Sequence, residues 1–338
     1  MNFTPEADSV PRKPLVSIIL PAYNSADFLE AAIARLLTQS CRDFEIVVVD
    51  DGSTDATAQL GAHLAGVHDR VQFLRLEING GVAGARAFGV KRSHGQFIWF
   101  VDVDDSAPPA ALERLIAAAE TTGADLIIGS AEMHTQSGAI RLIAAPPYDG
   151  PVTGLVAFAG LLCGKISGHL WNKLIRRSVA EAIDFTPATV HSDLAMTGQL
   201  LVHSHTVAAI PDIVYCYRLR SGSIVHSGRR RDESLRLLEV AITGAAQHAD
   251  PDLVASVEFR YFVLRYIVLS GIKDALLYPY SSGERQFLLR QSRLRLTWRQ
   301  LDVFLHFGDP QRLLLAVTAK TSVRLHRQVL KLAGSRGN

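Results

Sequence analysis

The sequence lacks most features of membrane-spanning, secreted or zinc-binding proteins. It contains only 3 Cys among 338 residues and no CxxC pair, which argues against a disulfide framework and a zinc knuckle. The longest apolar stretch, near Val254–Ile272, is interrupted by charged residues, so no run reaches the roughly 18–20 apolar residues of a membrane span. The polar residues 1–14 lack the apolar segment of a signal peptide. We therefore expect a cytoplasmic protein, with peripheral contact to the inner face of the membrane left open.

Known glycine-rich phosphate-binding patterns are also missing. The segment Gly80-Gly81-Val82-Ala83-Gly84 does not form GxGxxG and follows the third predicted strand, not the first, which argues against a dinucleotide-dependent oxidoreductase. No GxxxxGK[ST] loop is present. The segment PAYNSAD after the first strand lacks the Gly- and Arg-rich loop expected of a nucleotidyltransferase.

The charge is unevenly distributed, although the formal net charge is only +2. Residues 285–338 hold 11 Lys and Arg against two acidic residues, whereas the remainder holds 24 basic and 31 acidic residues. The basic tail favours an anionic surface or partner, or else a solvated face. Nucleic acid is disfavoured as the partner, because the basic residues are not interleaved with stacking aromatics. At 48% hydrophobic and 20% charged residues, the chain can bury a core.

The first half alternates strand-like and helix-like patterns. Apolar runs rich in β-branched residues predict buried strands at Val16–Leu20, Phe44–Val49, Val71–Leu76, Phe97–Val101 and Asp125–Ile128. Helical spacing predicts helices at Asp27–Gln39, from Asp55 onward, at Ala83–Ser93 and at Ala110–Thr121. This rhythm predicts an α/β fold, with a mostly parallel sheet flanked by helices on both faces.

The pattern changes further along the chain. Residues 145–168 are rich in Pro and Gly and predict loops. Strand patterns return at Trp171–Arg176 and Ile210–Leu219, with a helix at Asp193–Ser204 between them. After Ser227 the sequence is Leu- and Arg-rich and helical. We expect a flexible N-terminus at 1–13, a catalytic domain at 14–228 and a helical, basic C-terminal region at 229–338.

Polar clusters follow the predicted strands, where ligands of parallel sheets usually bind. The sharpest is Asp102-Val103-Asp104-Asp105. On an extended segment Asp102 and Asp104 point one way and Asp105 the other. Clustered carboxylates repel one another unless a cation neutralises them, and their hard oxygen atoms suit Mg²⁺ or Mn²⁺. An acidic turn that caps the next helix is the alternative.

Three other residues, two at strand ends and one on the helix after the third strand, suit a nucleotide. Asp50 directly follows a buried strand, where a carboxylate can accept a base N–H. Tyr23 offers a face for stacking the base, or it packs in the core. The forked guanidinium N–H groups of Arg86 suit a diphosphate, or else Arg86 lies on the surface.

These clusters, in this order, resemble the donor-site motifs of family 2 glycosyltransferases, which have the GT-A fold. The matching segments are PLVSIILPAYN, VVVDDGSTD, NGGVAGAR and HGQFIWFVDVDD. The resemblance continues through WNKL with Arg176, HSDL at residues 191–194, and YCYRLRSGSI at residues 215–224. It implies a mostly parallel, Rossmann-like sheet with a helical C-terminal extension.

The resemblance implies a role for each matching residue. Donor-binding residues would be Pro21, Ala22, Tyr23, Asn24, Asp50, Asp51, Arg86, Asp102 and Val103. Tyr23 and Asp50 would hold the nucleobase, implied to be uracil, and Asp104 would bind the metal. Asp193 would be the general base, although Ser192 replaces the usual Glu before it. Asp184 and His191 are weaker alternatives for the base.

The acceptor or phosphate side is expected to involve Trp171, Lys173, Arg218, Arg220 and His226. In the tail, four basic residues recur at spacings of four, three and four and form one helical stripe; they are Lys320, Arg324, Arg327 and Lys331. This helix either lies on an anionic membrane, which would suit a lipid-linked acceptor, or packs with its basic face in water.

Together these expectations describe an inverting, metal-dependent transferase. It would move a hexosyl or N-acetylhexosaminyl group from a nucleotide-diphosphate donor, a UDP-sugar, to a hydroxyl of a glycan or lipid-linked glycan. A non-catalytic sugar-nucleotide-binding or scaffold protein derived from such an enzyme is the alternative, because Ser192 leaves the base motif half present.

Overall fold

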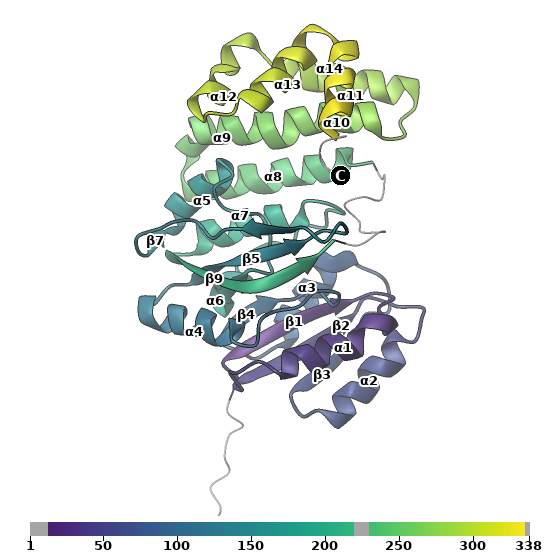
Figure 1. The fold of residues 1–338 in the computed structure, drawn as a ribbon, viewed down its shortest axis with the longest axis vertical. Helices are drawn as coiled ribbons and strands as arrows, with labels where there is room; N and C mark the ends of the chain where they lie inside the picture. The colour runs from purple at the N-terminus through teal and green to yellow at the C-terminus, as the bar shows by residue number, and fades with distance from the viewer. Residues whose placement is uncertain (1–12, 220–229, 335–338) are drawn as a thin grey trace, which may run out of the picture.

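The computed structural model describes residues 13–219 and 230–334 and shows a sheet with helices on both faces, extended by further helices (Figure 1). The strands are β1 (Val16–Ala22), β2 (Phe44–Asp50), β3 (Val71–Arg75), β4 (Phe97–Phe100), β5 (Leu126–His134), β6 (Ile140–Ile143), β7 (Val152–Thr153), β8 (Lys173–Arg176) and β9 (Thr206–Arg218). They form one sheet in the order β3-β2-β1-β4-β8-β5-β9-β7, with β6 paired to β5.

The sheet is mostly parallel, as the sequence predicts. Strand β1 pairs in parallel with β2 and β4, β2 with β3, and β5 with β9, whereas β8 runs antiparallel between β4 and β5. Every residue of β1 is buried. A strand covered on both faces needs apolar side chains on both, which explains the unbroken apolar run in the sequence.

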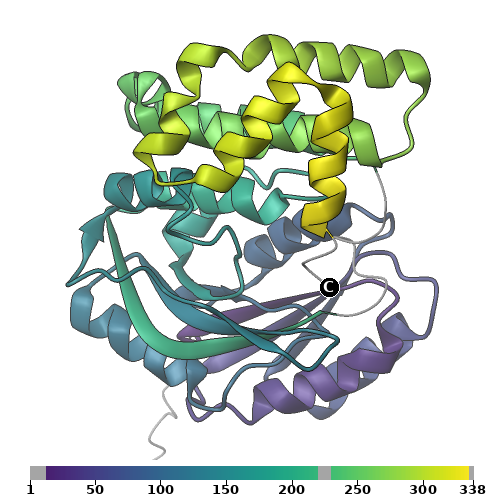
Figure 2. The same cartoon turned by 45° about the horizontal axis from the view of Figure 1, so that its top comes forward.

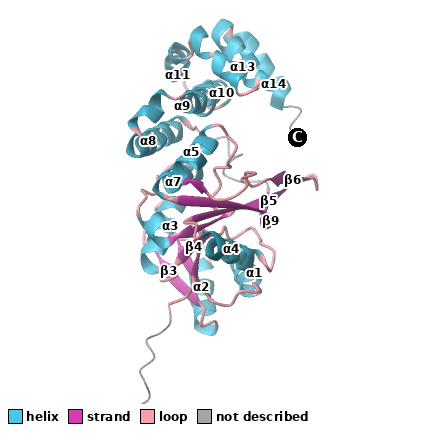
Figure 3. Cartoon of the chain, turned by 90° about the vertical axis from the view of Figure 1, so that its left-hand side faces the viewer, coloured by secondary structure: helices cyan, strands magenta, loops and turns pink. Residues whose placement is uncertain are grey.

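Helices from the first two-thirds of the chain cover the two faces of the sheet (Figure 3). They are α1 (Ala26–Leu37), α2 (Thr57–Val67), α3 (Gly81–Arg92), α4 (Ala111–Thr122), α5 (Gly154–Leu162), α6 (Arg177–Glu181) and α7 (Ser192–His203). One core cluster joins the sheet to α1, α2 and α4, and another joins it to α3, α5, α6 and α7.

The prediction of loops at residues 145–168 is wrong in part, because α5 lies within this range. Its N-cap Thr153 accepts a hydrogen bond from the Val156 N–H. A Cβ at Gly154 would lie 2.1 Å from the carbonyl oxygens of Leu201 and Ser204, at the end of α7. The glycines that argue for a loop in the sequence therefore permit close packing of two helices.

All described elements after β9 are helical. They are α8 (Asp232–Ala249), η2 (Pro251–Ala255), α9 (Val257–Phe262), the π-helical η3 (Val263–Val268), α10 (Leu269–Leu277), α11 (Ser282–Arg295), η4 (Trp298–Gln300), α12 (Asp302–His306), α13 (Pro310–Thr321) and α14 (Val323–Gly334). Residues of α8 and α9 extend the core beside α5 and α7, whereas α12 and α13 share a separate core with α10.

The C-terminal helices thus stack as layers on one side of the α/β domain, and α14 turns back toward that domain (Figure 2). Within residues 13–219 and 230–334, no helix combines the length and the apolar character that crossing a membrane requires.

Candidate functional site

The polar clusters meet because three parallel strands end at the same edge of the sheet. Ala22 at the end of β1 is in register with Asp50 at the end of β2, and β4 lies on the other side of β1. Tyr23, Asp51 and Asp102 follow the ends of these strands. The sheet topology therefore gathers the predicted donor-site residues at one edge.

Asp50 and Tyr23 contrast sharply in exposure. The Asp50 carboxylate is fully buried, accepts the Ser53 N–H at 3.1 Å and lies 3.3 Å from the Arg75 Nε. The Tyr23 side chain is 50% exposed. Asn24 has a φ of 47° and donates its N–H to Ser53 Oγ at 2.8 Å, which ties the β1–α1 loop to the β2–α2 loop. An exposed ring thus extends from a rigid corner that contains a buried carboxylate.

Pro21 and Ala22 are buried in β1, and Val103 is buried after β4. Asp51 holds a neighbouring loop in place. Its Oδ1 accepts the Gly80 N–H at 2.7 Å, and only 3% of the residue is exposed. Burial raises the pKa of Asp51, and the hydrogen bonds from Gly80 and Gly81 oppose that rise. Asp51 therefore fixes the glycine-rich turn that begins α3.

Arg86, from α3, links two carboxylates that are distant in the sequence. Its Nη1 lies 2.6 Å from Asp193 Oδ1, and its Nη2 lies 2.9 Å from Asp102 Oδ1. Burial would lower the pKa of Arg86, but the two carboxylates outweigh burial and raise it. The guanidinium, expected from the sequence to approach a diphosphate, lies between Asp102 and Asp193 in this structure.

Asp193 lies in the first turn of α7 with 26% of its side chain exposed. Burial would raise its pKa, but Arg86 and the Leu170 N–H outweigh burial and lower it. The N-terminal end of a helix also favours a negative charge. Asp193 is therefore an ionised carboxylate that remains partly open to solvent.

The two alternatives for the base lie elsewhere. Asp184 is exposed, and its N–H bonds to Gln199 in the later part of α7, away from the Arg86 network. Burial and the charge of Arg231 lower the pKa of His191 to about 4. Of the three candidates, only Asp193 contacts Arg86.

The carboxylates after β4 differ in their surroundings. The Asp102 side chain is 30% exposed, and Asp104 is half-buried. Asp105 is buried and accepts hydrogen bonds from the Tyr215 hydroxyl and the Arg218 N–H, both at 3.0 Å. Burial, followed by the charge of Asp102, raises the pKa of Asp105 to about 7. The segment is a turn and not an extended strand, since the Asp105 N–H bonds to the Asp102 carbonyl.

A stack of aromatic rings supports this turn. Tyr215 accepts the Asp102 N–H at 3.0 Å through its hydroxyl oxygen, and its ring lies 4.6 Å from that of Trp171. On the other side, the His169 ring lies 4.5 Å from Trp171. Sequence reasoning missed His169 and Tyr215 as site residues, although Tyr215 begins the YCYR motif.

The predicted acceptor-side residues are not equivalent. Trp171 is buried within the aromatic stack. Lys173 is fully buried, and its ammonium donates to the carbonyls of Ser167 and His169 and to Asn172 Oδ1. In this structure the Lys173 ammonium thus holds the segment that precedes β8 and does not reach the surface. Arg218 is exposed. Arg220 and His226 lie outside the described residues.

Carboxylates are concentrated after β4 and at the start of α7. Asp102 and Asp193 both contact the buried guanidinium of Arg86, and Asp104, two residues after Asp102, keeps part of its surface in solvent. Carboxylate oxygens fit Mg²⁺ or Mn²⁺ better than softer metals. The residues present are thus compatible with a divalent metal ion.

Comparisons with known proteins identify related sequences and folds. Residues 17–157 match the family described as Glycosyl transferase family 2. The chain is 27% identical over 222 residues to glycosyltransferase GlyG of Streptococcus pneumoniae serotype 4, covering 63% of this chain and 73% of that relative. Two other curated relatives align over only about a third of their own length, and three more over about two-thirds.

Two solved structures share the fold. The S. aureus TarS 1–349 complex with UDP-GlcNAc superposes with a TM-score of 0.67 at 22% identity, covering 95% of this chain and 92% of that chain. The mannosyltransferase PcManGT from Pyrobaculum calidifontis, solved with GDP-Man and Mn²⁺, gives a TM-score of 0.51 at 15% identity, covering 92% of this chain and 88% of that chain. The likeness to TarS extends over the helical C-terminal region as well as the sheet.

Proposed function

Because this chain is a family 2 glycosyltransferase with its family domain at residues 17–157, we propose that it transfers a sugar from a UDP-sugar to an acceptor hydroxyl with inversion of configuration. The sugar would be a hexose or an N-acetylhexosamine, and the acceptor a glycan or lipid-linked glycan. One observation carries the proposal: Arg86 joins Asp193, the candidate base, to Asp102 at the donor edge.

The donor would lie across the ends of β1, β2 and β4. The exposed face of Tyr23 offers stacking for uracil, and the buried Asp50 carboxylate offers an acceptor for a base N–H. Pro21, Ala22, Asn24 and Val103 would form the surrounding wall, and Asp102 would contact the nucleoside or the sugar. The likeness to a fold solved with UDP-GlcNAc supports this choice of donor.

Asp193 would act as the general base. Its pKa is lowered chiefly by Arg86, so it is ionised near neutral pH and can take the acceptor's proton as that oxygen attacks the anomeric carbon. The bond to the diphosphate breaks as the new glycosidic bond forms, so one displacement inverts the configuration. Arg86 would orient Asp193 and place positive charge near the reacting centre.

Asp104 would hold a divalent metal ion, Mn²⁺ or Mg²⁺. When bound, the metal would supply positive charge that offsets the charge of the departing nucleoside diphosphate. The buried hydrogen bonds of Asp105 to Tyr215 and Arg218 would keep the Asp104 turn in one conformation. The PcManGT complex with Mn²⁺ supports this assignment at the level of the fold.

The acceptor would approach from the side of Arg218, which is exposed. Arg220 and His226 would follow it along the chain and could bind a phosphate of the acceptor. Trp171 would support this side from within the core. A lipid-linked acceptor would also suit contact of the basic C-terminal helices with a membrane surface.

Calorimetry of UDP binding, with and without Mn²⁺, tests the donor site. We expect wild-type binding to strengthen with Mn²⁺ and this dependence to disappear in Asp104→Ala. Asp27→Ala, which removes an exposed carboxylate on α1, is the control. Absence of UDP binding under every metal condition would contradict the UDP-sugar proposal.

A screen of UDP-sugars with glycan acceptors then separates the enzyme from its alternative. A non-catalytic sugar-nucleotide-binding protein would bind UDP as tightly but would neither hydrolyse nor transfer any sugar.

A further inference from the structure

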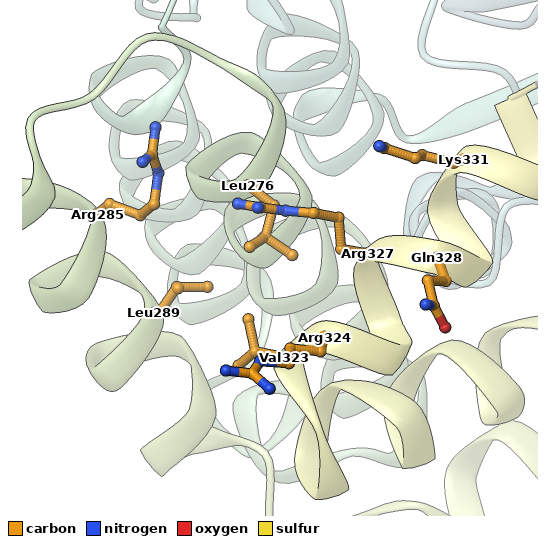
Figure 4. A pocket seen from close by; sticks show the side chains of 8 residues that line it. All are labelled: Leu276, Arg285, Leu289, Val323, Arg324, Arg327, Gln328 and Lys331. Carbon is orange, nitrogen blue, oxygen red and sulfur yellow. The ribbon is translucent and has the colours of Figure 1, made fainter.

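A cationic pocket lies in the C-terminal region, between α10, α11 and α14 (Figure 4). Its volume is about 370 Å³. Four basic side chains line it: Arg285 from α11, and Arg324, Arg327 and Lys331 from α14. The other lining side chains are three apolar ones, Leu276, Leu289 and Val323, and the amide Gln328. The pocket therefore has both cationic and apolar side chains in its lining.

No carboxylate is among the residues that line this pocket. The Arg285 Nε donates to the Ala275 carbonyl at 2.9 Å, which anchors the base of that side chain. Arg324 and Arg327 extend from α14 on the side of the pocket that faces α10 and α11 (Figure 4). Like charges gathered around a cavity repel one another unless an anion occupies it. The charge pattern thus selects an anionic ligand, and the forked guanidinium groups suit phosphate.

Two exposed leucines of α14 that lie outside the pocket lining add a second requirement. Leu325 and Leu332, on α14 between and beyond the basic residues, are 45% and 68% exposed. A helix that displays leucines beside cations has the character of an interfacial helix, whose apolar side chains enter the acyl boundary while its cations meet headgroups. A free anion in water would make no use of these leucines.

We propose that this pocket binds the phosphate headgroup of an anionic membrane lipid, with the exposed leucines of α14 entering the lipid layer. The proposal does not depend on the sugar donor, since none of these residues belongs to the donor edge. It goes beyond a diffuse basic face, because it assigns the binding to a defined set of side chains on α11 and α14.

Co-sedimentation of the full chain with vesicles tests the proposal. We expect binding to mixed phosphatidylcholine–phosphatidylglycerol vesicles and little binding to phosphatidylcholine alone. Arg324→Gln combined with Arg327→Gln should weaken binding by about 10- to 30-fold, since each cation near an anionic surface contributes several-fold. Arg290→Gln combined with Arg299→Gln removes the same charge from exposed positions outside the pocket and should weaken binding only a few-fold.

A second matched pair of variants tests the contribution of the exposed leucines to vesicle binding. Leu332→Ser should weaken vesicle binding, whereas Leu305→Ser, at a position 67% exposed on α12, should not. Retained UDP binding and unchanged thermal unfolding would show that each variant is folded.

Three results would overturn the proposal. They are failure of the wild type to bind anionic vesicles, an equal loss in the two double variants, and pocket-dependent binding of inorganic phosphate without vesicle binding. The last result would assign the pocket to a soluble anion. If UDP binding fails while vesicle binding behaves as expected, the UDP-sugar proposal is wrong and the lipid-pocket proposal is retained.

Discussion

The two ends of the molecule use arginine in opposite ways. At the donor edge, Arg86 is buried between two carboxylates and is outnumbered by acidic groups. Around the pocket of α14, arginines and a lysine gather with no carboxylate in the lining. The first arrangement holds charged groups in a fixed geometry, which suits catalysis. The second leaves positive charge uncompensated, which suits an anionic surface.

The ion pairs of the two regions also differ in burial and therefore in their contribution to the free energy of unfolding. The ion pairs of Arg86 connect α3, the β4 end and α7, and losing the arginine would leave two carboxylates partly buried. The pair of Arg295 with Glu239 lies at the surface of the helical region. Buried pairs fix a structure because breaking them is costly, whereas exposed pairs contribute little. The following substitutions test this contrast.

Asp193→Asn should have the largest effect. It removes the proposed base while keeping an oxygen that can accept from Arg86, so we expect turnover to fall roughly 10²- to 10⁴-fold with UDP binding retained. Asp184→Asn is the control and should leave turnover nearly unchanged. Because the pKa of Asp193 is lowered, protonation of Asp193 should not limit wild-type turnover until the pH falls below the ordinary range of carboxyl pKa values. Full turnover in Asp193→Asn would assign the base to another residue.

Arg86→Met should destabilise the fold by roughly 2–4 kcal/mol, somewhat below a fully buried pair because Asp102 and Asp193 keep partial exposure. Arg295→Gln, which breaks the surface pair with Glu239, should cost about 0–1 kcal/mol. Urea denaturation of both variants measures the difference in the free energy of unfolding. Equal losses of unfolding free energy in the two variants would contradict this contrast between the regions. Arg86→Lys, which keeps the positive charge, should be less destabilising than Arg86→Met.

Two glycine substitutions should have smaller effects than Arg86→Met, and with opposite signs. Gly154→Ala should destabilise by about 1–3 kcal/mol, because its Cβ would meet two carbonyl oxygens at 2.1 Å. Gly244→Ala, inside α8 with nothing within 4 Å of the added Cβ, should stabilise by about 0.5–1 kcal/mol. Thermal unfolding compares them. A stable Gly154→Ala variant would mean that α5 and α7 can separate without cost.

Much of the fold could be predicted from the sequence because its signals are local. The apolar runs at Val16–Leu20 and Phe44–Val49 each report a buried strand within a few residues, and the alternation with helices implies a parallel sheet. Helix α5 was missed because Pro and Gly usually end helices. Its formation depends on packing against α7, which no short window of sequence contains.

The positions of the site residues likewise depend partly on local sequence and partly on contacts between distant elements. The positions of Asp50 and Asp102 at strand ends follow from the sequence alone, since each comes directly after a buried strand, and parallel topology then brings those ends together. The contact of Arg86 with Asp193, 107 residues further along the chain, and the burial of Lys173 in the core depend on the three-dimensional packing. The same holds for the gathering of Arg285 with the basic residues of α14. Periodicity reports which face of an element is buried, but pairing between distant elements depends on how whole layers pack.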